Sequence, residues 1–202
     1  SHEINSSSGV FSGERRKRGG DLEFYAEVFS TCIFGISNKK TELDERYDKI
    51  SADFDQYRDR SLEFLSLLTL LEATVKWQGQ TRWSNSVDLF TLLHVCWGYR
   101  DALAGASADS LVEVRNVLDV FQRTVLAYKR DAVSEQTSDL VAALAGLLAI
   151  SSEEVEASLS GYISGIRNSS DLGSRRARSS RLSEVLKHVL EHEGPDTDRS
   201  IV

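Results

Sequence analysis

Residues 62–71 read LEFLSLLTLL, an apolar run that only Glu63, Ser66 and Thr69 interrupt. On an α-helix, a run of this kind places apolar side chains on most sides of the helix axis. A helix that is apolar on most sides is buried inside a globular protein rather than lying on its surface. We therefore predict that residues 62–71 form a helix central to the hydrophobic core.

The same helix is predicted to begin well before this run. Thr41 is a good N-cap, and Asp44 three residues later forms a weaker version of the capping box. Apolar residues continue at helical spacing from residue 43 to residue 75. An unbroken helix over residues 41–78 would be about 57 Å long. We expect a kink near residues 58–61, because the hydrophobic face changes phase there.

Helical spacing recurs in both directions from this segment, and no alternating strand pattern is found. The other predicted helices cover residues 21–35, 84–104, 107–130, 138–149 and about 152–167, and a last helix follows a turn at 168–173 and runs to Glu193. Ser107 is expected to cap the helix at 107–130. Ser151 or Ser152 is expected to cap the helix at 152–167, with Glu153 or Glu154 completing a capping box. A single proline, Pro195, agrees with long helices. We predict an all-α fold of about seven helices in a compact orthogonal or bundle-like array, without a sheet.

The predicted helices form one domain at residues 20–193. Residues 1–19 are expected to be disordered or extended, and residues 194–202 a flexible tail. The chain contains no methionine, so we expect a piece of a longer protein, with Ser1-His2 interpreted as tag residue. No stretch approaches the roughly 18 apolar residues of a membrane span, and the N-terminus lacks the apolar core of a signal peptide. These observations predict a cytoplasmic protein.

The residues suited to catalysis or metal binding are scattered rather than clustered. Cys32 and Cys96 lie in apolar helical runs, which predicts buried free thiols. His94 is expected to be a core histidine with one hydrogen bond rather than a catalytic base. His188 and His192 stand four residues apart with Glu184 and Glu191 nearby, but the pattern lacks a third ligand, so we predict no metal site. No Ser-His-Asp or Cys-His arrangement is recognisable, which predicts a chain without a catalytic centre.

The chain has three tryptophans, two of which flank one predicted turn. Trp97 is expected in the core. Trp77 and Trp83 flank the turn at residues 79–82 and either staple it to the core or form half of a binding surface. We favour the staple.

The formal net charge of −7 argues against a protein whose main task is coating nucleic acid. Basic residues nevertheless cluster near both ends of the chain. The two clusters are Arg15, Arg16, Lys17 and Arg18, and Arg175, Arg176, Arg178 and Arg181. Each arginine offers a planar fork of donors matched to phosphate oxygens. These residues are therefore either local phosphate contacts or an ordinary solvated surface.

Three stretches, taken together and in order, resemble a known family. They are RRKRGGDLEF at residues 15–24, SVDLFTLL at 86–93, and YISGIRNSSD at 162–171, which is followed by Arg175-Arg176-x-Arg178 leading into Leu182 and Leu186. In this order they resemble the helical C-terminal part of the ParB/sulfiredoxin-like NTPase family, found in GmrSD-type modification-dependent restriction and phage-defence proteins. The resemblance covers about residues 14–190.

In that family, nucleotide chemistry is attributed to an upstream αβ part with an Asp-Gly-Gln-Gln-Arg motif, and some relatives carry a His-Asn-His nuclease module downstream. This sequence has neither. Its Gly79-Gln80-Thr81-Arg82 segment resembles the motif only superficially, because it lacks the aspartate. The resemblance thus implies no cofactor in this chain, with NTP and a divalent metal belonging to the parent protein. It also implies a helical scaffold that contacts the phosphates of a nucleic acid, with DNA as the expected partner. The second implied partner is the upstream NTPase part of the same protein or a partner subunit. The alternative is a protein-protein interaction or dimerisation module without nucleic-acid contact.

Overall fold

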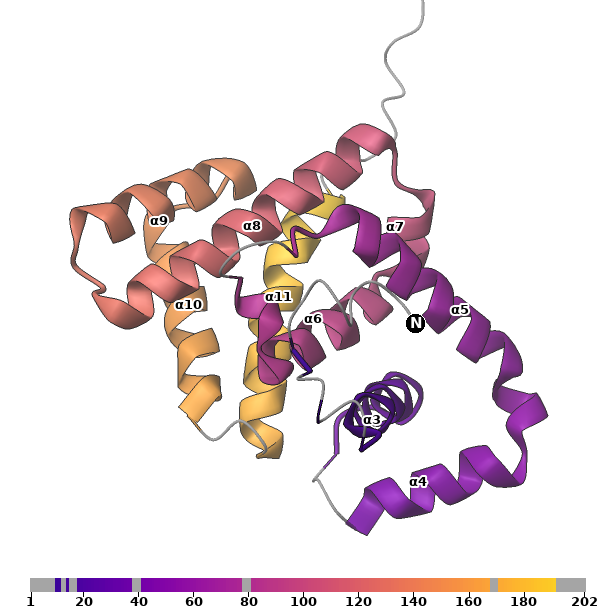
Figure 1. The fold of residues 1–202 in the computed structure, drawn as a ribbon. Coiled ribbons are helices and arrows are strands. Elements are labelled where there is room, and N and C mark those ends of the chain that lie inside the picture. The colour runs from indigo at the N-terminus through magenta and orange to yellow at the C-terminus, as the bar shows by residue number, and fades with distance from the viewer. Residues whose placement is uncertain are drawn as a thin grey trace, which may run out of the picture.

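The computed structural model describes residues 10, 11, 14, 18–37, 41–77, 81–167 and 171–191. Every regular element in these residues is helical, which confirms the predicted all-α class (Figure 1). The elements are α3 (Gly20–Phe34), α4 (Thr41–Ala52), α5 (Phe54–Thr74), the short 3-10 helix η1 (Arg82–Ser84), α6 (Ser86–Gly98), α7 (Arg100–Gly105), α8 (Ala108–Arg130), α9 (Glu135–Leu148), α10 (Ser152–Arg167) and α11 (Leu172–Glu191).

Side-chain caps fix where several of these helices begin. The hydroxyl of Ser107 accepts a hydrogen bond from the backbone N–H of Ser110 at 3.1 Å, as predicted for the start of α8. A full capping box starts α10: Ser151 Oγ accepts from the backbone N–H of Glu154 at 3.2 Å, and Glu154 Oε2 accepts from that of Ser151 at 2.9 Å. The open choice between Ser151 and Ser152 is thus resolved in favour of Ser151.

Two predicted long helices are each divided into two. The helix predicted at 41–78 breaks at Asp53, where φ is −141° and ψ is 64°, and not near 58–61. The break turns α4 away from α5 and lets α4 pack against α3 as well (Figure 1). The helix predicted at 84–104 breaks at Tyr99, which separates α6 from α7. The described residues therefore hold nine α-helices instead of about seven.

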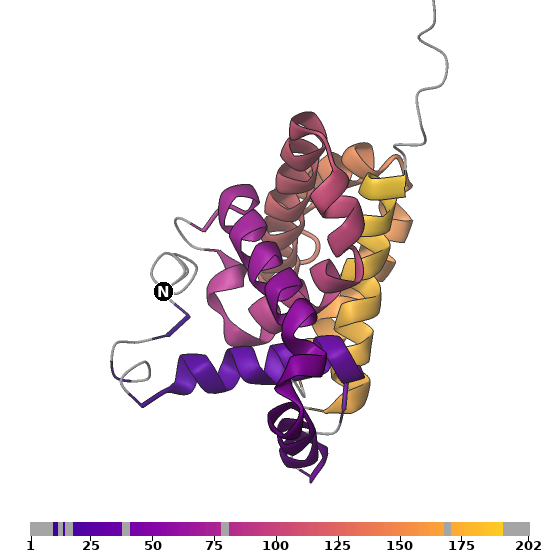
Figure 2. The same cartoon turned by 90° about the vertical axis from the view of Figure 1, so that its right-hand side faces the viewer.

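Helix α6 is the centre of the core. It packs against α3, α5, η1 and α11, while α8 pairs with α9 and α10 pairs with α11. Figure 2 shows α11 running along one side of the molecule with α3 lying crosswise to it. Buried hydrophobic side chains from α3 to α11 belong to one contiguous cluster. All three tryptophans are buried in it, and Trp77 Nε1 donates to Leu71 O at 3.1 Å, so the staple is confirmed.

The run at residues 62–71 is only partly core. Phe64, Leu67, Leu68 and Leu71 are buried, but the side chain of Leu62 is 57% exposed and that of Leu65 is 46% exposed. The prediction that this run is central to the core is therefore wrong for one side of α5. The reason is that α5 has packing partners on one side, while its other side faces away from the core.

Most of the predicted flexible ends, 1–19 and 194–202, lie outside the described residues. Phe11 is one of the described residues of the N-terminal segment. It is 2% exposed, and its ring lies 5.3 Å from the Phe24 ring, edge to face. Hydrophobic burial thus fixes this point of the N-terminal segment against α3.

The cysteines and the lengths of the helices bear on two further predictions from the sequence. Both cysteines are free thiols, as predicted; the predicted burial is confirmed for Cys96, while Cys32 is only partly buried. Burial raises the pKa of the Cys96 thiol to about 12. Among the described helices, none is long and apolar enough to cross a membrane.

Candidate functional site

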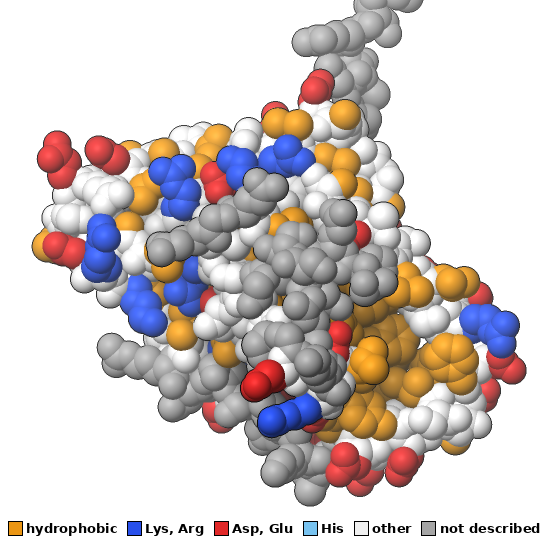
Figure 3. All heavy atoms as spheres, in the orientation of Figure 1, with side chains coloured by type: hydrophobic (Ala, Val, Ile, Leu, Met, Phe, Trp, Pro, Cys, Tyr) orange, Lys and Arg blue, Asp and Glu red, His pale blue; other side chains and the backbone are white. Residues whose placement is uncertain are grey.

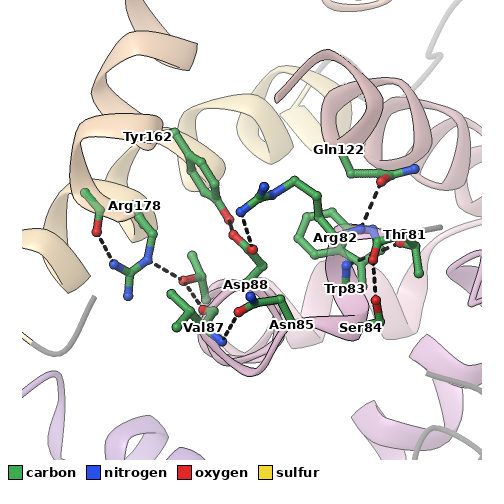
Figure 4. A network of polar contacts seen from close by, with 12 residues as sticks. Thr81, Arg82, Trp83, Ser84, Asn85, Val87, Asp88, Gln122, Tyr162 and Arg178 are labelled. Carbon is green, nitrogen blue, oxygen red and sulfur yellow. Dashed lines mark hydrogen bonds and ion pairs between the residues drawn. The ribbon is translucent and has the colours of Figure 1, made fainter. Parts of the chain in front are cut away.

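A buried polar network joins η1, α6, α8 and α10 (Figure 4). Asp88 is fully buried, and each of its oxygens accepts one hydrogen bond. Oδ2 accepts from Arg82 Nη2 at 2.5 Å, and Oδ1 accepts from Tyr162 Oη at 2.8 Å. Gln122 Oε1 on α8 accepts from the backbone N–H of Arg82 at 3.0 Å. The carboxylate is thus compensated by a charge and by a phenol, as a buried charge requires.

The phenol of Tyr162 acts as a neutral donor in this network. Burial first, and then the negative charge of Asp88, raise the pKa of Tyr162 well above its ordinary value. Each of these groups is hydrogen-bonded to another group of the protein. The network therefore connects four helical elements.

Arg175 and Arg178, two of the residues predicted to contact phosphates, are buried in the fold. Arg175 Nη2 donates to Glu27 Oε1 on α3 at 2.7 Å, and its guanidinium carbon lies 4.6 Å from the centre of the Phe90 ring. Arg178 is 1% exposed; its Nε donates to Thr91 Oγ1 at 3.2 Å and its Nη1 to Gly165 O. Burial lowers the pKa of Arg178 from its ordinary value. The prediction that these two side chains contact phosphates is corrected, because both guanidinium groups are enclosed by protein.

The spacing on α11 contains the signal for this burial. Arg175 and Arg178 continue the i, i+3, i+4, i+7 series of the buried residues Leu182, Val185 and Leu186, whereas Arg176 falls outside it. Positions on the apolar face of an amphipathic helix point inward even when an arginine occupies them. Proximity in the chain alone places these arginines in one cluster, whereas their helical phase separates the buried Arg175 and Arg178 from the exposed Arg176.

The remaining predicted contact residues have different surroundings. Arg18 and Arg176 are exposed. Arg181 is half-buried, lies across Gly161 of α10, and donates to Glu184 Oε2 at 2.9 Å. Arg15, Arg16 and Lys17 lie outside the described residues. Among the described candidates, two arginines are therefore exposed.

The histidines do not assemble a metal site within the described chain. His94 is largely buried, burial lowers its pKa, and its Nδ1 has no hydrogen-bond partner among the described residues. The single hydrogen bond expected for His94 is thus not found at that atom. His188 is half-buried, and His192 lies outside the described residues. The described part of the chain contains no group of three or more His, Cys, Asp or Glu side chains arranged for a metal ion.

The outer side of α5 is an exposed apolar surface. Three large hydrophobic side chains share it: Phe54 (50% exposed), Leu62 (57%) and Leu65 (46%). We call these three residues the α5 surface. At 100° per residue they fall within about 80° of one another around the helix axis. Figure 3 shows that hydrophobic side chains also gather in the angle between α4 and α5.

A groove of about 590 Å³ adjoins the α5 surface at Leu62 and lies between α5 and α7. We call it the α5–α7 groove. Its hydrophobic lining consists of Leu62, Leu67, Leu70 and Ala104. Its polar lining consists of Asp59, Glu63, Ser66, Arg100 and Asp101. The groove thus combines an apolar floor with three carboxylates and one guanidinium.

Contacts within the protein hold the one guanidinium of the groove in place. Arg100 Nε donates to Glu63 Oε2 at 3.2 Å and its Nη1 to Trp97 O at 3.2 Å, with the guanidinium carbon 4.8 Å from the Trp97 ring centre. Glu63 also accepts from Arg60 Nη1 at 2.9 Å, and this bond, with that from Arg100, lowers the pKa of Glu63. Asp59 has no such partner among the described residues, and Asp101 is 88% exposed at 3.4 Å from Arg100. The groove therefore keeps an excess of negative charge.

No family model, curated protein or solved structure matches this chain. The resemblance to the ParB/sulfiredoxin-like NTPase family therefore stays a prediction.

Proposed function

We propose that this domain is a protein-protein interaction module that docks a partner on the α5 surface. The observation that carries the proposal is the exposure of Leu62 and Leu65 on a helix whose opposite side is buried. Single exposed leucines are common on protein surfaces. Three large hydrophobic side chains on one side of one helix, beside a groove with an apolar floor, are typical of an interaction site.

The energetic reason is the cost of leaving these side chains in water. Burial of one leucine side chain contributes about 1.5–3 kcal/mol relative to its exposed state. A partner that covers the α5 surface would recover a large part of this contribution for Leu62 and Leu65. The docking role agrees with the alternative predicted from sequence, in which the arginines are bystanders.

The family resemblance suggests what the partner would be. Under that proposal, the domain is the helical part of a bacterial defence protein of the modification-dependent restriction type. Its docked partner is the NTPase part of the same protein or a partner subunit. The nucleotide, the divalent metal and any nuclease chemistry then belong to that partner.

Direct contact with DNA has weaker support. Two of the four arginines near the C-terminal end are enclosed by protein, and Arg181 is paired with Glu184. Only Arg18 and Arg176 of the described candidates are exposed. If these two arginines carried the phosphate contacts of a chain with net charge −7, binding would be weak and would disappear as salt rises.

The test is a site-dependent purification from a lysate of the source organism. Leu62→Glu combined with Leu65→Glu is expected to keep the fold, because both side chains are exposed, and to lose at least tenfold of one protein that the wild type enriches. The matched control, Val112→Glu with Leu147→Glu, adds the same two charges at positions that are 49% and 47% exposed on α8 and α9. Equal enrichment by all three proteins, or by none, would contradict docking on α5.

A further inference from the structure

We propose that the α5–α7 groove accepts an amphipathic helix whose apolar face is flanked by lysine or arginine. This inference rests on the proposed docking function and names the chemistry of the partner. It follows from three properties of the groove: its apolar floor, its length along α5, and its excess of carboxylates.

The floor and length of the groove suit a helix. Its lining residues on α5 run from Asp59 to Leu70, a rise of about 16 Å along the helix axis. That length matches about three turns of a second helix lying alongside. Leu62 is exposed at the edge of the groove, and Leu67 is buried at its base. Helix-in-groove recognition uses apolar side chains at i, i+3, i+4 and i+7 in this arrangement.

The charges of the groove select a basic partner. Glu63 is satisfied by Arg60 and Arg100, but Asp59 lacks a cation among the described residues and Asp101 is almost fully exposed. Both carboxylates line the groove, as do Leu62 and Ala104. Asp101 already forms an ion pair with Arg100 at 3.4 Å but remains 88% exposed. Lysine or arginine next to the apolar face of a docked helix would pair with Asp59 and complement the negative potential of both carboxylates.

The same charges disfavour a second copy of this chain as the occupant. In a two-fold dimer both subunits contribute the same surface patch to the interface. Dimerisation through this groove would bring Asp59 and Asp101 of one protomer close to those of its partner. Like charges placed opposite one another oppose association, and the net charge of −7 adds to the repulsion.

The experiment uses two fluorescently labelled synthetic peptides of about 18 residues, about five helical turns. Both carry leucine at i, i+3, i+4 and i+7; one has lysine at the other positions and the second has glutamate. Fluorescence anisotropy against the whole domain is expected to show saturable binding of the Leu/Lys peptide and at least tenfold weaker binding of the Leu/Glu peptide.

Two groove variants separate seating in the groove from general attraction to an acidic protein. Leu62→Glu makes the groove more acidic, so a purely electrostatic complex would tighten. A helix seated on Leu62 is expected instead to bind about tenfold more weakly, because it loses an apolar contact. Ser66→Trp, at an exposed position that lines the groove, fills it without a change in charge and is expected to weaken binding equally. Circular dichroism checks that both variants are folded.

A charge-matched pair of variants tests the carboxylates. Asp59→Asn with Asp101→Asn is expected to weaken the Leu/Lys complex about three- to tenfold. Asp139→Asn with Glu156→Gln makes the same change in net charge at exposed positions on α9 and α10 and is expected to leave it unchanged. Comparable affinity for both peptides, or tighter binding by Leu62→Glu, overturns the basic-helix inference. The proposed docking function is then judged separately by the purification with the Leu62 and Leu65 variants.

Concentration-dependent dimerisation that Leu62→Glu abolishes would also overturn the inference and identify a second copy as the occupant. Light scattering of the wild type at increasing concentration, without peptide, provides this measurement. We expect a monomer throughout.

Discussion

Replacing Asp88 by alanine is expected to lower the free energy of unfolding by about 3–5 kcal/mol, measured by urea denaturation. Asp88 is fully buried and compensates Arg82, whose side chain is 9% exposed. Without the carboxylate, a guanidinium stays buried without its counter-charge, and the hydroxyl of Tyr162 loses its acceptor at 2.8 Å. A loss of this size is a large fraction of the stability of an ordinary domain.

An exposed ion pair supplies the matched control for Asp88. Glu191 lies 3.6 Å from Lys187 on α11 and its side chain is 61% exposed, so Glu191→Ala is expected to change stability by less than about 0.5 kcal/mol. A combined variant, Arg82→Met with Asp88→Leu and Tyr162→Phe, removes all three polar partners together. It is expected to be more stable than Asp88→Ala, because no charge is left uncompensated. If Asp88→Ala and Glu191→Ala had equal stabilities, the network would not hold the fold together.

Arg178→Ala is expected to lower the free energy of unfolding by about 2–4 kcal/mol, while Arg176→Ala changes it by less than about 0.5 kcal/mol. Arg178 fills a buried volume against α10 and donates to Thr91 Oγ1 and Gly165 O. Arg176 is exposed two residues away on the same helix. The pair is thus matched in residue type, helix and charge, and differs in burial.

The same pair distinguishes a structural arginine from a phosphate contact. Urea denaturation gives the stability of each variant, and anisotropy with a labelled DNA duplex at low salt gives any affinity. A normal unfolding curve for Arg178→Ala together with a reduced DNA affinity would contradict the assignment of Arg178 to the core. Such a result would restore the prediction made from the sequence.

The helices could be predicted because their signals are local. Apolar residues at helical spacing and capping side chains such as Ser107 and Ser151 act over a few residues of chain. The breaks at Asp53 and Tyr99 could not be predicted in the same way. Apolar residues continue on both sides of each break. Helix α4 packs against α3 and α7 packs against α5, and these contacts between helices are not visible in the local sequence pattern.

The candidate site was harder to predict because exposure depends on tertiary packing. An apolar run such as 62–71 predicts a buried helix only if partners cover every side, and the fold leaves the side of Leu62 and Leu65 uncovered. For the arginines on α11, charge alone predicted a surface position. The helical phase they share with Leu182 and Leu186 predicts burial, and the burial of Arg175 and Arg178 agrees with the phase.

The most direct test of docking on α5 is photo-crosslinking from two positions of the protein in its source cells. A benzophenone amino acid replaces Leu65 on the α5 surface in one variant and Arg176 on α11 in the other. Docking on α5 predicts that position 65 yields one discrete adduct that protease removes and nuclease leaves intact, while position 176 yields none. An adduct formed only from position 176 and removed by nuclease would contradict it and identify nucleic acid as the partner.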